Sequence, residues 1–101
     1  MSLYNYFVET KEGLTFHFYT SDIKDVEEGL KRKKEFSEGD YWILDAGYNQ
    51  DIKDAYEVFE EDDSFVKIPK SSVIRFFSIA GKPPKQLKAI KSKNLSDFFK
   101  K

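Results

Sequence analysis

The fold is decided by residues 3–20, which read LYNYFVETKEGLTFHFYT. Tyr, Phe, Val and Thr dominate both halves of this stretch, as is typical of strands, and Lys11-Glu12-Gly13 separates the two halves. A three-residue loop with Gly13 in the left-handed region predicts a β-hairpin with a bulge at the turn. The predicted cross-strand pairs are Thr10 with Leu14, Val8 with Phe16 and Tyr6 with Phe18.

This register gives the hairpin one apolar face and one mixed face. Pairing register is fixed most strongly when one face is buried, so we expect the apolar face to lie in the core. The apolar face consists of Tyr4, Tyr6, Val8, Leu14, Phe16 and Phe18. The mixed face consists of Asn5, Phe7, Glu9, Thr15, His17 and Tyr19.

An amphipathic helix is predicted over residues 22–35. Ser21 or Thr20 is expected to accept the free N–H groups at its start. The four cations at 31–34 fall in the last turns, where the helix dipole favours them. Gly29 weakens the middle, so the helix has an alternative end there. The apolar stripe, at spacings of three and four, consists of Ile23, Val26 and Leu30.

The next segment predicts a strand, a turn and an ambiguous stretch. Residues 41–44 are apolar on both faces, which favours a central strand, and residues 46–49 have the composition of a turn. Residues 50–60 have apolar residues at helical spacing. However, the carboxylates at 60–63 would crowd the negative end of such a helix. We therefore favour a short strand over 55–59.

Two more strands are predicted, over 65–68 and 73–79. Pro69 ends the first, because proline supplies no N–H to a ladder. The second is expected to be the final strand and to present Val73, Phe77 and Ile79 on one face. The sequence thus predicts an α+β domain: a small antiparallel or mixed sheet of about five to six strands with one packed amphipathic helix and a basic C-terminal tail.

Charge divides the chain into two parts. Residues 1–81 carry a net charge of −7 and residues 82–101 a net charge of +6, which together give the −1 of the whole chain. Such asymmetry indicates an acidic globular domain over 1–81 and a basic tail over 82–101 with separate tasks. The chain has no cysteine, no leader-like N-terminus and no apolar run long enough for a bilayer, so we expect a soluble, cytoplasmic protein that does not bind membranes.

No pattern of residues predicts catalysis, a metal site or a cofactor. His17 is the lone histidine, and no nucleophile motif accompanies it, so we interpret it as a surface residue. The acidic run 60–63 lacks the ligand spacing of a calcium loop and is interpreted as a solvated turn. The glycines are too far apart to form a phosphate-binding loop. We therefore expect a protein that is not an enzyme.

The basic tail has a composition that suits nucleic acid. Lysines neutralise phosphates and release counterions, and phenylalanines stack on unpaired bases. The alternative is a solubilising tail or a helix docked on the acidic domain. The residues concerned are Lys82, Lys85, Lys88, Lys91, Lys93, Lys100 and Lys101, with Phe98 and Phe99.

The last ten residues resemble the short peptide, QxxLxxFF, by which DNA-maintenance proteins dock on sliding clamps. Leu95, Phe98 and Phe99 match its three apolar anchors in spacing, and Ser92 stands where that motif has glutamine. The resemblance covers eight residues and implies a one-turn apolar plug for a groove on a protein partner.

The folded domain offers a third contact surface. Phe7, Tyr19 and Trp42 are predicted to be exposed aromatic residues, which are favoured at protein interfaces. The strand at 73–79 is a candidate edge strand that pairs with a second copy to give a homodimer. By elimination, the sequence favours a non-enzymatic binding or adaptor protein.

Overall fold

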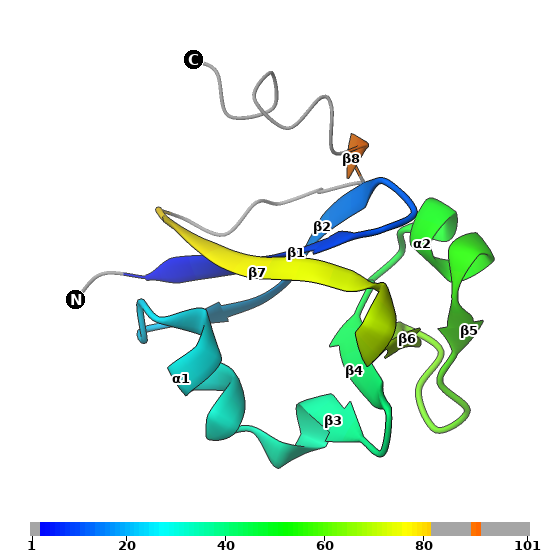
Figure 1. Ribbon diagram of the computed structural model, residues 1–101, viewed down its shortest axis with the longest axis horizontal. Coiled ribbons are helices and arrows are strands. Elements are labelled where there is room, and N and C mark those ends of the chain that lie inside the picture. The colour runs from blue at the N-terminus through cyan, green and yellow to red at the C-terminus, as the bar shows by residue number, and fades with distance from the viewer. Residues whose placement is uncertain (1–2, 82–89, 92–101) are drawn as a thin grey trace.

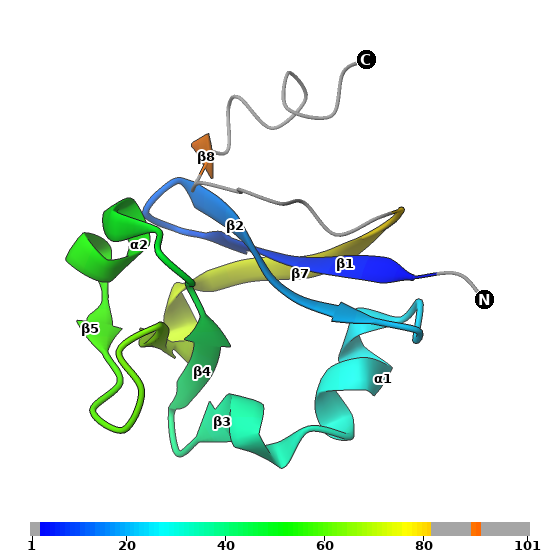
Figure 2. The same ribbon diagram turned by 180° about the vertical axis from the view of Figure 1, so that it is seen from behind.

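A computed structural model describes residues 3–81 and 90–91 of the chain. They form an α+β domain with two antiparallel sheets, as Figures 1 and 2 show from opposite sides. The first sheet has the order β7-β1-β2-β8, with bounds Val73–Ala80, Tyr4–Thr10, Leu14–Ser21 and Ile90–Lys91. The second has the order β3-β4-β6-β5, with bounds Ser37–Glu38, Tyr41–Asp45, Phe65–Pro69 and Glu57–Val58. The helices are α1 (Val26–Lys31) and α2 (Gln50–Ala55), with single 3₁₀ turns η1 (Lys34–Phe36) and η2 (Lys70–Ser72).

The predicted α+β class is confirmed, but the single sheet with one helix is not. The described residues contain two sheets and two short α-helices. None of the helices in this part of the chain is long and apolar enough to cross a membrane. The division into a domain over 1–81 and a tail over 82–101 stays a prediction.

The β1–β2 hairpin turns where the sequence predicts. Gly13 has φ +82°, and its N–H donates to the Thr10 carbonyl at 3.0 Å. Val8 faces Phe16 as expected, but beyond that pair the register shifts, because Phe7 faces His17 whereas Tyr6 faces Tyr19. The predicted pair Tyr6–Phe18 is therefore wrong.

The shift is a β-bulge, and it sends two successive aromatic side chains to the core side. Phe18 is 3 % exposed, and Tyr19 packs against the same core instead of joining the mixed face. The Tyr19 ring lies 5.8 Å from the Tyr6 ring and 5.0 Å from the Phe36 ring. A bulge allows this because one extra residue on one strand reverses the alternation beyond it.

The core lies between the first sheet, α1 and the second sheet. The apolar face predicted for the hairpin belongs to it: four of its six residues are buried and the other two pack against the cluster. The buried cluster consists of Tyr6, Val8, Phe16, Phe18, Val26, Leu30, Phe36, Leu44, Ala46, Ile52, Val66 and Ile68.

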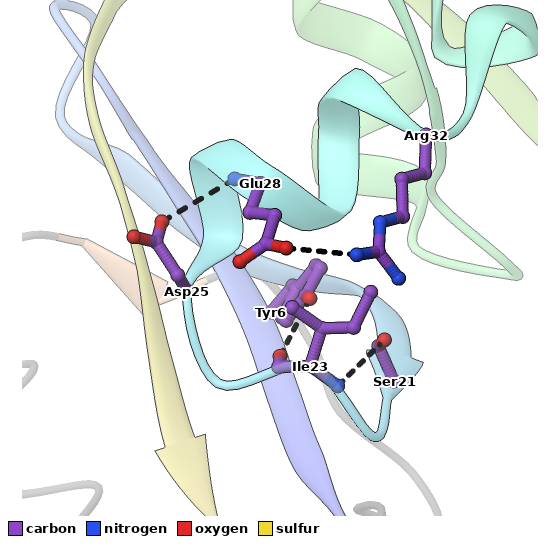
Figure 3. A network of polar contacts seen from close by, with 6 residues as sticks. All are labelled: Tyr6, Ser21, Ile23, Asp25, Glu28 and Arg32. Atoms are coloured by element: carbon purple, nitrogen blue, oxygen red, sulfur yellow. Dashed lines mark hydrogen bonds and ion pairs between the residues drawn. The ribbon is translucent and has the colours of Figure 1, made fainter.

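Helix α1 is shorter than predicted and begins later. Its N-cap is Asp25, whose carboxylate accepts N–H groups from Glu27 and Glu28 at 2.9 and 3.3 Å, so the predicted cap at Ser21 or Thr20 is wrong. Ser21 instead accepts the N–H of Ile23, and the Tyr6 hydroxyl donates to the Ile23 carbonyl at 2.7 Å (Figure 3). These two bonds hold the chain in a turn before the helix starts.

Helix α1 passes Gly29 and ends at Lys31, so the alternative end at Gly29 is also wrong. Beyond it the chain turns through Lys33, which has φ −121° and ψ 86°, and enters η1. Phe36 of η1 is 5 % exposed and contacts the Phe18 ring edge-to-face at 6.0 Å. Burial of this ring on the core requires the chain to leave the helix four residues before the predicted end.

The segment 50–60 contains both of the structures that its sequence allows. Asn49 caps α2 by accepting the Ile52 N–H, and Ile52 is fully buried. The strand that we favoured over 55–59 is reduced to β5, which pairs with β6 through Glu57–Lys67 and Val58–Val66. The acidic run forms the turn between these strands, so its carboxylates do not meet the end of α2.

Strand β7 is an edge strand of its sheet, as the sequence suggests, and it pairs with β1 through seven of its eight residues. A register shift beside Thr10 places Val73 against the core, whereas Phe77 stacks on Phe7 on the opposite face. The predicted common face of Val73, Phe77 and Ile79 is therefore wrong. The expectation that β7 is the last strand is also wrong, because β8 pairs with β2 at Leu14 and Thr15.

Candidate functional site

An open groove lies where α1 and η1 meet strands β3, β4 and β7. Its volume is about 470 Å³. Figures 1 and 2 show α1, β3 and β4 in the lower part of the molecule, with β7 above them. The lining residues are Glu27, Leu30, Lys31, Lys33, Lys34, Ser37, Trp42 and Phe76.

The floor of the groove is aromatic. Trp42 of β4 and Phe76 of β7 meet edge-to-face, with ring centroids 5.1 Å apart and planes at 82°. Both side chains pack against the core and are only partly buried. Leu30 joins them from α1, because it is the last buried position of the helix stripe. The two sheets and α1 thus bring together three apolar side chains from separate parts of the sequence.

The rim of the groove is basic because α1 ends in a run of cations. Lys31, Lys33 and Lys34 line it, and Lys70 from η2 places its Nζ 5.0 Å from the centroid of the Trp42 ring. In the part of the chain that the structure describes, no ion pair engages Lys31 or Lys34. Arg32 points elsewhere and binds Glu28 at 2.9 Å (Figure 3).

Lys33 keeps its charge. Its Nζ lies 3.6 Å from a Glu35 oxygen and 5.4 Å from the centroid of the Tyr19 ring. Interaction with the Tyr19 phenol, and then with the Glu35 carboxylate, raises the pKa of Lys33 above its ordinary value. The groove therefore joins an apolar floor to a positively charged rim, opposed by the single carboxylate of Glu27.

The three aromatic residues predicted to be exposed on the folded domain differ in their burial. Trp42 lies in the groove, half-buried. Phe7 is 1 % exposed between Phe77 and His17, so the expectation that it is an exposed aromatic is wrong. Tyr19 is half-buried on the core side, where the bulge turns it, and its ring lies near Lys33.

The candidates in the tail fall largely outside the described residues. Lys91 belongs to β8, whose backbone pairs with Leu14. The others, which lie outside the described residues, are Leu95, Phe98, Phe99, Lys88, Lys93, Lys100 and Lys101.

His17 is not the simple surface residue that the sequence suggested. Its ring is half-buried against Phe7 at 5.4 Å, and its Nε2 lies 3.1 Å from the Thr20 hydroxyl. That hydroxyl donates its hydrogen to Asn5 Oδ1 at 2.9 Å, so it presents a lone pair to the imidazole. The pair therefore forms a structural hydrogen-bond chain, and the Thr20 hydroxyl is not arranged as a nucleophile activated by His17.

Burial is the main cause that lowers the pKa of His17 below 6.5, against opposing effects of the Tyr19 backbone and Asp45. The unfolded chain then binds a proton more readily than the folded protein. We expect full stability above pH 6.5 and a decline as the pH falls below it toward the folded-state pKa. Urea titrations across this range check the prediction. His17→Gln is expected to remove the decline, because His17 is the only histidine of the chain; an unchanged decline in this variant would contradict it.

Metal ligands do not gather in the described residues: no three His, Asp or Glu side chains there are arranged to hold an ion. Comparison of the chain with protein-family models, with curated proteins and with solved structures gives no match. The groove is therefore the feature of the molecule that indicates function.

Of the residues that line the groove, only Trp42 is among the contact residues predicted from the sequence. The pattern of the run Lys31 to Lys34 predicts only a complement to the helix dipole. This run directly follows the apolar stripe of the helix. That position indicates a groove with cations beside an apolar surface. Phe76 carried no comparable signal, since its proximity to Trp42 depends on how the two sheets pack.

Proposed function

We propose that this protein is a small non-enzymatic binding or adaptor protein of the cytoplasm, which acts through contacts with a protein partner in the groove between α1 and β4. The observation that carries the proposal is the partly buried pair Trp42–Phe76, open to solvent beside Lys31 and Lys34. Tryptophan and other aromatics, set in a depression and surrounded by polar groups, are the residues that dominate binding energy at protein interfaces.

The size of the groove also supports a binding role. A volume of about 470 Å³ falls within the range of sites that take a small ligand or a few side chains. The chemistry available there is recognition: aromatic rings for apolar contact, ammonium groups for charge and hydrogen bonds, and one carboxylate. The proposal includes no reaction step.

A photoreactive side chain at Ser37, on the groove wall, is expected to capture the partner in living cells. The double variant Lys31→Glu/Lys34→Glu should reduce capture at least several-fold, because it reverses two rim charges that face the partner. The matched control is Lys11→Glu/Lys24→Glu, which makes the same charge change at exposed positions outside the groove lining. Equal capture by both double variants would refute the groove as the contact surface.

Nucleic-acid association through the lysine-rich residues 82–101, including docking through the clamp-like peptide at 92–99, is a second candidate. The charge of +6 in this segment favours it. If this candidate is right, the photoreactive Ser37 variant captures nucleic acid or a sliding clamp. The yield of that capture does not change in the groove variants.

A homodimer formed by pairing of β7 edges is the remaining candidate for the partner. The edge position of β7 and the 57 % exposure of Ile74 favour it. Arg75, exposed on the same strand and bonded to Glu9 at 2.7 Å, is a charge of the kind that discourages edge pairing. A second copy as the captured protein would identify this case.

A further inference from the structure

We propose that the occupant of the groove is a short acidic segment of a partner protein that carries one aromatic or long aliphatic anchor. This inference rests on the proposed function and specifies its ligand. It depends on three properties of the groove: the charge of its rim, the shape of its floor and the position of its single carboxylate.

The rim charge selects an anion. Lys31 and Lys34 have no ion-pair partner among the described residues, and Lys33 stays protonated beside Tyr19 and Glu35. These cations are a local exception, because residues 1–81 together carry a net charge of −7. A long polyanion such as nucleic acid would also be repelled by the net negative charge of the domain, whereas a short acidic segment contacts mainly the lysines.

The floor selects an apolar anchor. The edge-to-face pair of Trp42 and Phe76 leaves ring surface open to the groove, and Leu30 closes one side. When a phenylalanine, tyrosine or leucine of the ligand inserts, its apolar surface and the apolar surface of the groove floor are both removed from water. A purely acidic peptide gains nothing from this floor, so the anchor and the acids are both required.

The single carboxylate orients the segment. Glu27 precedes Lys31 by one helical turn on the same face of α1, and Lys34 lies beyond Lys31 in η1. The groove is thus negative at one end and positive at the other. The acidic residues of the ligand are therefore placed on the η1 side of its anchor, and a neutral or basic residue is placed beside Glu27.

Fluorescence of Trp42 tests the inference directly, because it is the only tryptophan of the chain. The probe is a short synthetic peptide in which one phenylalanine has glutamates on both sides, titrated into the full chain. One side then meets the lysines, and the other meets Glu27 unfavourably. Saturable, salt-sensitive binding is expected. The affinity for the peptide should fall about ten-fold in Lys31→Glu/Lys34→Glu and stay unchanged in Lys11→Glu/Lys24→Glu. In Glu27→Lys it should rise about two- to five-fold.

Three control ligands decide against other chemistries. A peptide with lysine in place of glutamate and a peptide with alanine in place of phenylalanine should each bind at least ten-fold more weakly. Equal binding of either one, tighter binding of a single-stranded oligonucleotide, or no binding of the acidic peptide would overturn the inference. The peptide inference can fail while the photoreactive Ser37 variant still captures a protein, with less capture in Lys31→Glu/Lys34→Glu. In that case the proposed function stands. If that capture is absent as well, the proposed function and the peptide inference are both refuted.

Discussion

Replacing Phe16 by alanine is expected to destabilise the protein by about 3–5 kcal/mol. Phe16 is 2 % exposed, faces Val8 across the hairpin and belongs to the buried cluster that joins the two sheets. Truncation removes the transfer free energy of the ring and leaves a cavity. The strands around the cavity are fixed by their ladders, so they cannot close it fully.

The matched control is Tyr48→Ala, which deletes a ring of similar size from a fully exposed position. Its expected cost is within about 0.5 kcal/mol, because no burial is lost. Urea unfolding curves of both variants, with midpoints compared at equal slope, measure the difference. Similar costs for the two variants would mean that the Phe16 side of the hairpin is not the core.

The hairpin shows what sequence alone can predict. Alternation of apolar residues and the glycine at the turn identify both strands, the loop and the buried face, because these features depend on neighbouring residues only. The bulge opposite Tyr6 and Phe7, where the pairing skips Phe18, is not predictable in this way. Phe18 and Tyr19 are both large and aromatic, and only the packing of Phe36 against them shows that both turn toward the core.

The helix boundaries were missed for a related reason. Local rules predict a cap at Ser21 or Thr20. The observed cap, Asp25, follows from Tyr6, which holds the Ile23 carbonyl from another strand. The start of α2 is similar: Asn49 caps it, although the acids at 60–63 argued against any helix. The chain turns back into β5 before those acids are reached, and that turn depends on pairing with β6.

Only part of the groove could be predicted, because its floor comes from non-local packing. Trp42 and the cations at 31–34 are visible in the sequence, but nothing in either segment indicates that Phe76 lies beside them. The structure shows why: β4 and β7 belong to different sheets, and their contact requires the sheets to pack across the common core.

Replacing Gly29 by alanine is expected to destabilise the protein by about 1–3 kcal/mol, opposite in sign to what helix propensity predicts. In a helix interior, alanine is favoured over glycine by about 1 kcal/mol. Here, however, a Cβ at position 29 would overlap the hydroxyl of Tyr6 and lie 2.9 Å from two of its ring carbons. Tyr6 is fully buried and bonded to the Ile23 carbonyl, so it cannot move without losing that bond.

Overpacking of this kind costs about 1–3 kcal/mol, and loss of the Tyr6 hydrogen bond adds about 1 kcal/mol, which together exceed the gain in propensity. A double-mutant cycle with Tyr6→Phe isolates the contact, because phenylalanine lacks the hydroxyl that a new Cβ would meet. Gly29→Ala should cost at least about 1 kcal/mol less in the Tyr6→Phe background than in the native one. The ring carbons keep part of the clash, so relief is incomplete.

Additive costs, or an alanine that stabilises the native background, would show that α1 does not lie against Tyr6. The groove wall built on α1 would then be misplaced as well.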